Sequence, residues 1–156
     1  MSSRVFGLIE VSGLADELLF NPVNFKQLCI QGTLTIPAAK PEVEQIVCVA
    51  AEVLIKRTRV INTPVGTSIE GQKLTGKKLV VEGVISQKIE YVADEPMQSL
   101  HAANFNMPFS GFIVLPAAFH AGTPVQVTGY IEDLFVELLN KHTIFRNVNI
   151  LLNATF

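Results

Sequence analysis

The chain has 156 residues, of which 49% are hydrophobic and only 17% are charged, and its net charge is −2. This length suits one domain with a sizeable core, and no apolar run approaches the roughly 18–20 residues of a membrane-spanning helix. Basic residues are scattered, which disfavours nucleic acid as a partner because such proteins concentrate them on one face. The low charge and a mean hydropathy of +0.38 lead us to expect self-association, since soluble monomers seldom expose large apolar patches.

The N-terminal quarter predicts two strands. Residues 4–12 favour a first strand that ends at Gly13, and residues 15–20 allow at most one helical turn because Pro22 limits it. Residues 25–36 favour a second strand, since large apolar side chains recur there at every second position.

The middle of the chain carries the strongest strand signal. Residues 42–56 are apolar at both odd and even positions, which is typical of a central strand buried on two faces. Residues 66–76 are predicted to be loop. Residues 74–96 then alternate between large apolar odd positions and polar even positions, which predicts one dry and one wet face. Gly83 interrupts the dry face and indicates a bulge or a close backbone approach.

The C-terminal third is predicted to continue as strands. Residues 107–116 form a short apolar segment whose Pro108 suits a strand start or a sheet edge. Residues 131–139 fit either a helix face or a strand, but the turn-like residues 140–143 and the strand-like residues 144–156 favour a hairpin. The fold class expected is therefore all-β, with at most one or two short helices, in an antiparallel β-sandwich-like domain.

Candidate chemistry is sparse. Cys29 and Cys48 lie in apolar runs and are predicted to be buried, and all three histidines are predicted in loops without the spacing of a metal site. Adjacent carboxylates such as Glu132 and Asp133 would point to opposite faces of a strand and make a poor acid–base pair. We therefore predict no enzyme activity, no catalytic or metal-binding residues and no cofactor.

The two ends of the chain are the candidate assembly sites. Both segments, 1–12 and 144–156, are strand-like and apolar, and a terminal strand is tied down either within its own sheet or on a neighbour's sheet edge. The residues expected to make assembly contacts are Val5, Phe6, Leu8, Ile9, Ile150, Leu151 and Leu152.

Several segments together resemble the SPOCS domain of spore-coat-associated morphogenetic proteins in endospore-forming Clostridia. They are Pro41–Ile46, Leu79–Gly83, Ile89–Ala93, Pro108–Ser110 and Ile113–Pro116, and the likeness extends over about residues 7–155. The resemblance implies a β-rich domain with a structural role in the spore envelope and without catalytic residues. The best-known member also carries a LysM domain that docks onto the coat's basement protein, and this sequence contains no such segment.

The leading hypothesis is a single domain over residues 1–156 that acts as a non-enzymatic structural protein of the spore coat or surface. Its expected partners are itself and other spore-envelope proteins, with no nucleic acid and no membrane span. The start of the chain lacks the pattern of a signal peptide, so we expect synthesis in the cytoplasm. The alternatives are a glycan- or small-ligand-binding β-module, weakened because Trp is absent and Tyr occurs only at 91 and 130, and a hydrolase using Glu132 or Asp133.

Overall fold

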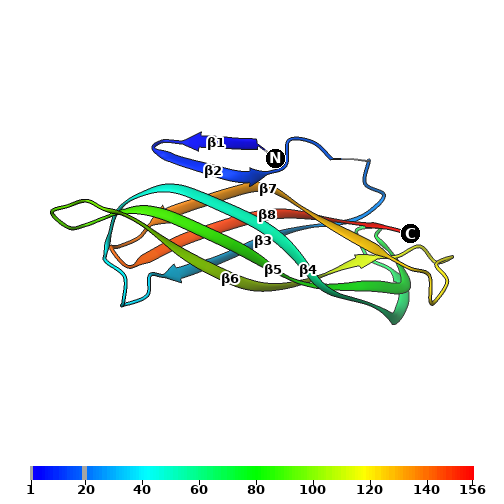
Figure 1. Ribbon diagram of the computed structural model, residues 1–156. Coiled ribbons are helices and arrows are strands. Elements are labelled where there is room, and N and C mark those ends of the chain that lie inside the picture. Colours follow the sequence, from blue (N-terminus) through cyan, green and yellow to red (C-terminus); the bar gives the residue numbers. More distant parts are fainter. Residues whose placement is uncertain (1, 19–20) are drawn as a thin grey trace.

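A computed structural model describes residues 2–18 and 21–156 of the chain (Figure 1). The strands of this part are β1 (Ser2–Phe6), β2 (Ile9–Leu14), β3 (Asn24–Thr35), β4 (Val43–Thr67), β5 (Lys73–Ala93), β6 (Leu100–Val114), β7 (Gln126–Leu138) and β8 (Thr143–Thr155). These described residues contain no helix, and therefore no helix that is long and apolar enough to cross a membrane. The prediction of an all-β fold is confirmed.

The strands form two sheets that pack face to face as a sandwich (Figure 1). The five-stranded sheet has the order β1-β2-β4-β5-β6, and the three-stranded sheet has the order β3-β8-β7. Across the sandwich, β4 contacts β7 and β6 contacts β3. All neighbours are antiparallel except β2 and β4, which pair in parallel over Glu10–Ser12 and Cys48–Ala50. The antiparallel sandwich is thus confirmed, with one parallel pair added.

The core lies between the inner faces of the two sheets, as the period of two along β5 predicts. Leu79, Val81, Ile85, Ile89 and Tyr91 are each at most 1% exposed, whereas the alternate side chains of this strand point to the outer face. The Tyr91 hydroxyl donates a hydrogen bond of 2.9 Å to the carbonyl of Pro41, so this buried polar group is satisfied.

Gly83 marks a close approach within this row. A Cβ at Gly83 would lie 2.6 Å from the carbonyl oxygen of Leu54 and 2.7 Å from the ring of Phe109. Opposite Gly83, the pairing of β4 with β5 shifts between Ile55 and Arg57, which is a bulge in the neighbouring strand. Both features expected at this glycine are therefore present.

Two local predictions are wrong. The single strand over residues 4–12 is a hairpin of β1 and β2, whose turn contains Gly7 at φ +61°. Residues 15–18 form no helical turn, which the prediction of at most one turn allows, and residues 19–20 lie outside the described part. The loop over 66–76 is shorter, because β4 runs to Thr67 and β5 begins at Lys73. In each hairpin the opposite strand supplies backbone hydrogen-bond partners, which extends pairing into residues of weak strand propensity.

The predicted burial of the cysteines is also wrong, as is one histidine position. Cys29 is exposed and Cys48 is half-buried, and the two free thiols lie on different sheets. Their strand positions direct both side chains to the outer faces, where the Cys29 thiol donates to the Asn147 Oδ1 at 2.9 Å. His101 lies in β6 rather than in a loop, and its ring stacks on Tyr91 with centroids 6.0 Å apart.

Candidate functional site

The β1–β2 hairpin carries the N-terminal residues expected to make assembly contacts. It lies at one edge of the five-stranded sheet, beside β7 (Figure 1). Val5 is 69% exposed and Leu8 is 78% exposed, whereas Ile9 is half-buried and packs against the core. The side chain of Phe6 lies outside the described part of the structure. Val5 and Leu8 are thus the predicted contacts that the fold leaves on the surface.

The C-terminal members of the set lie in the interior of the fold. Ile150, Leu151 and Leu152 belong to β8, which is the central strand of the three-stranded sheet, and each is at most 4% exposed. Ile150 and Leu152 face the core, and Leu151 lies on the outer face beside Gln27 of β3. Gln27 reaches across to β7 and donates hydrogen bonds to the carboxylate of Glu132. Within the domain these three side chains are already packed.

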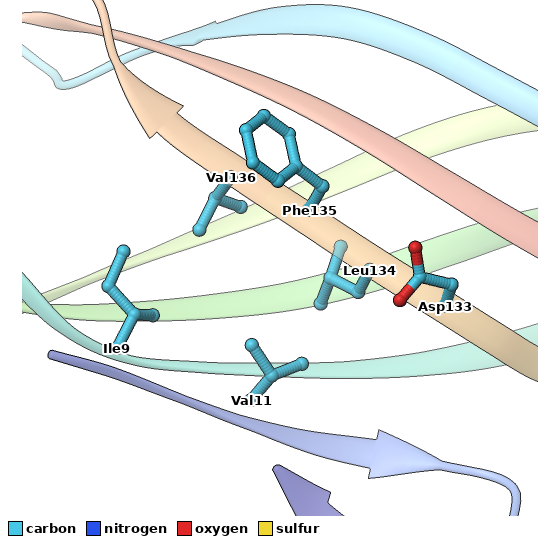
Figure 2. A pocket seen from close by; sticks show the side chains of 6 residues that line it. All are labelled: Ile9, Val11, Asp133, Leu134, Phe135 and Val136. Carbon is cyan, nitrogen blue, oxygen red and sulfur yellow. The ribbon is translucent and has the colours of Figure 1, made fainter. Parts of the chain in front are cut away.

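A cavity of about 260 Å³ lies between the N-terminal hairpin and β7. Ile9 and Val11 line it from β2, and residues 133–136 line it from β7. Figure 2 shows Leu134 and Val136 pointing toward Ile9 and Val11, whereas Phe135 points to the other side of β7. The lining offers aliphatic groups and one carboxylate, that of Asp133, so it suits an apolar group better than a reaction.

The hairpin docks beside this cavity through a close backbone contact. Gly13 has φ +94°, and a Cβ at that position would lie 2.0 Å from the carbonyl oxygen of Ala51. Only glycine adopts this backbone conformation at such close approach without strain. The amide of Ala15 then donates a hydrogen bond of 2.9 Å to the carbonyl of Ile131 in β7. Strand β2 is therefore held by both sheets.

A buried arginine lies inside the sandwich. Arg146 of β8 is fully buried on the inner face, where it is paired with Gly32 of β3 and Val136 of β7. Its Nε, Nη1 and Nη2 atoms have no hydrogen-bond partner among the described residues, and neither has the side-chain amide of the buried Gln87. Burial lowers the pKa of the Arg146 guanidinium, because a low-dielectric interior disfavours the charged form.

Gly32 explains how this side chain fits. A Cβ at Gly32 would lie 3.5 Å from Nη2 of Arg146 and 3.1 Å from the methyl carbon of Met107, so the missing side chain leaves room for the guanidinium. Sequence reasoning missed Arg146. The alternation of residues 144–152 does place it in register with Ile144 and Val148, but a charged residue is rarely assigned to a buried face.

The outer face of the three-stranded sheet combines amides with aromatic rings. Gln31, Asn147 and Phe135 form one cross-strand row, and Phe25 and Phe135 are 43% and 47% exposed. The rings of Phe135 and Phe145 meet at an angle of 60° with centroids 6.3 Å apart. Such a face offers hydrogen-bond donors and acceptors beside apolar ring surface.

Ionisable side chains at the β7–β8 turn form ion pairs at the surface. Lys141, in the β7–β8 turn, pairs with Asp94 and lies 3.9 Å from Glu42, while Nε2 of His142 lies 3.1 Å from Glu42. The hydrogen bond from Lys141 to Asp94, supported by the charge of that carboxylate, raises the pKa of this lysine. No group of three or more metal-ligating side chains is present within residues 2–18 and 21–156. The ion pairs of Lys141 and His142 tie the β7–β8 turn to the ends of β4 and β5.

Comparison with known families gives a match to the family described as SipL, SPOCS domain, over residues 42–139. The chain belongs to the SPOCS domain family. The SPOCS match spans β4 to β7 and so includes the long β4–β5 hairpin. Strands β3 and β8, which complete the second sheet, lie outside it. The SPOCS family is associated with sporulation. No curated protein and no solved structure matches the chain.

Proposed function

We propose that this chain is a non-enzymatic structural domain of the spore envelope, in the coat or on the spore surface, and that it associates with copies of itself. Membership of the SPOCS family is the observation that carries the proposal, because it connects the chain with sporulation. The ion pairs of Lys141 and His142 fasten the β7–β8 turn to the ends of β4 and β5, which is in keeping with a structural role.

Open sheet edges support the self-association. Strands β1 and β6 end the five-stranded sheet, and β3 and β7 end the three-stranded sheet. The pairing of β2 with β4 stops at Ala50, so the rest of β4, to Thr67, has no strand on that side within the described chain. An edge strand presents unpaired N–H and C=O groups that another strand can pair with. Fusion of edges is thus the physical route by which such a domain would build a shell.

The test is the location of the protein in the spore. A tagged chain expressed from its own promoter in the sporulating host should appear in the coat extract of purified spores and be absent from the core fraction. Recovery in the core alone would remove the envelope role. A version lacking residues 2–14, which form the β1–β2 hairpin, serves as a second sample and shows whether β1 and β2 are needed for that location.

The outer face of the three-stranded sheet favours a second candidate, a glycan-binding module. Amide side chains that hydrogen-bond hydroxyls, set beside exposed Phe25 and Phe135, are the groups that a sugar-binding face uses. A glycan array with the wild-type chain and with Phe135→Ala tests it. Binding that the substitution abolishes would support a glycan-binding role, and an array without hits would remove it.

A further inference from the structure

Strand β3 is the sheet edge that, within the described part of the chain, has the fewest features that block strand addition. Natural proteins protect edges with prolines, bulges, charges or short strands. The pairing of β3 with β8 runs without a register shift over all 12 residues from Asn24 to Thr35. No proline lies in this strand, and Lys26 is its one charged residue.

The other edges are each protected. Strand β1 has five residues with an irregularity at Ser2 and Ser3, and β6 carries Pro108 within it. The open part of β4 contains Pro64 and two register shifts, and β7 has a shift between Ile131 and Asp133. This contrast singles out β3 as the edge that can accept a strand.

We propose that β3 is the homotypic interface of this protein, and that two copies pair their β3 strands antiparallel about a two-fold axis. The proposal deepens the self-association proposed above and rests on it. The two three-stranded sheets would merge into one six-stranded sheet of order β7-β8-β3-β3-β8-β7. Because both copies use the same strand, the contact is isologous and closes as a dimer.

The absence of like-charge contacts favours a second copy as the occupant. Antiparallel pairing centred on Ile30 sets Ile30 opposite Ile30, Leu28 opposite Gly32 and Lys26 opposite Leu34, so no like charges face each other. The Lys26 ammonium lies 4.9 Å from the centroid of the Phe112 ring in β6, and this contact directs its charge toward the other sheet.

The same pairing is unfavourable on β4 and β7. Self-pairing of β4 about Thr58 would set Arg57 opposite Arg59, and self-pairing of β7 about Phe135 would set Asp133 opposite Glu137. Like charges directly opposite one another across a strand pair destabilise it. The half-buried Leu28 and Ile30 of β3, in contrast, would lose further contact with water when a partner strand covers the edge.

The experiment compares two double substitutions of equal charge. Gln31→Lys with Thr33→Lys adds two exposed cations to the outer face of β3, and Gln126→Lys with Thr128→Lys adds two to the same face of β7. Size and affinity are measured by sedimentation on the full chain, and circular dichroism checks that both variants fold. We expect a wild-type dimer whose Kd rises at least about tenfold in the β3 variant and stays within about twofold in the β7 variant.

The outcomes distinguish a failure of the β3 interface from a failure of the proposed self-association. Dimerisation of the β3 variant with wild-type affinity would overturn the β3 interface and leave self-association standing. A wild-type chain that stays monomeric at about 100 μM, a concentration far above that of a stable dimer's Kd, would overturn both. In a background that carries both Cys29→Ser and Cys48→Ser, single cysteines at positions 27, 29, 31 and 33 add an independent readout: the cysteines nearest the axis, at 29 and 31, should form the intermolecular disulfide fastest. Equal cross-linking of a Thr128→Cys control in β7 would contradict the pairing.

Discussion

Replacing the buried Arg146 with methionine should stabilise the domain. The three guanidinium nitrogens have no hydrogen-bond partner among the described residues, and each buried unsatisfied polar group costs about 1–3 kcal/mol. Methionine keeps the unbranched aliphatic stem and fills most of the space beside Gly32. Replacing buried charges by apolar side chains of similar size has gained about 1–4 kcal/mol in other proteins, so we expect a rise of about 2 kcal/mol in the free energy of unfolding.

The assay is urea unfolding followed by far-ultraviolet circular dichroism, repeated at two protein concentrations because association adds to apparent stability. For a domain of this size, about 2 kcal/mol corresponds to an increase of about 4–8 °C in Tm. A decrease of more than about 1 kcal/mol in the Arg146→Met variant would refute the reasoning, since it would mean that the guanidinium makes a net stabilising contact.

A lysine at the same position adds a pH test. Burial lowers the pKa of the Arg146 guanidinium, which means that the charged guanidinium destabilises the folded state. This destabilisation persists below the folded pKa and is relieved only as the pH rises through that value, which for arginine lies far above neutral. Lysine starts from about 10.4 and is lowered further by burial. The folded state of Arg146→Lys then loses its proton at a lower pH than the unfolded state does, so the stability of this variant relative to the wild type should rise between about pH 7 and 10. Equal slopes would contradict a buried cation.

Three further predictions concern glycines and thiols. Gly83→Ala should destabilise the fold by about 1–3 kcal/mol, because the added Cβ would meet the Leu54 carbonyl and the Phe109 ring. Gly66→Ala, whose Cβ would meet nothing within 4 Å, is the control in the same unfolding assay. Equal losses of stability in the two variants would contradict the clash. Gly13→Ala should release the β1–β2 hairpin and so speed proteolysis of residues 15–18. Gly7→Ala, also at positive φ but with open space around its Cβ, should leave the rate of proteolysis unchanged. Unchanged cleavage in both variants would show that other contacts hold the hairpin. Cys48 should react with an alkylating reagent several-fold more slowly than the exposed Cys29, because burial and the nearby charges of Glu90 and Glu10 raise the pKa of its thiol. Mass spectrometry over a time course measures both rates, and faster alkylation of Cys48 would disprove the prediction.

The strands themselves could be predicted because their signal is local. The alternation over residues 74–96 reports which side chains of β5 face the core, and the turn-like residues 140–143 mark the β7–β8 hairpin. The predicted strand boundaries were wrong where pairing with a neighbouring strand extended a strand, as at Thr67 and Lys73. Propensity describes a residue alone, whereas a ladder partner is a property of the folded pair.

The order of the strands could not be predicted, and the candidate site depends on it. Ile150 to Leu152 appeared available for assembly because an apolar strand at the centre of a sheet and one at its edge have similar sequences. The position of β8 between β3 and β7 decides between them, and it arises from pairs such as Asn24 with Ala154, far apart in the chain. Arg146 was missed for a related reason, since its burial depends on the two strands that flank β8.

The central position of β8 has a consequence for the order of folding. During synthesis the ribosome releases β3 long before β8, and the 12 residues of β3 have no partner in their sheet until β8 follows. Closing so long a loop is slow, and unpaired edges invite wrong partners in the meantime. Residues 42–139 can pair β4, β5 and β6 early, so the first sheet would act as a template onto which β3, β7 and β8 assemble late. Chains therefore become competent for ordered contacts only after β8 has inserted, and until then the unpaired β3 is the strand most exposed to wrong pairing.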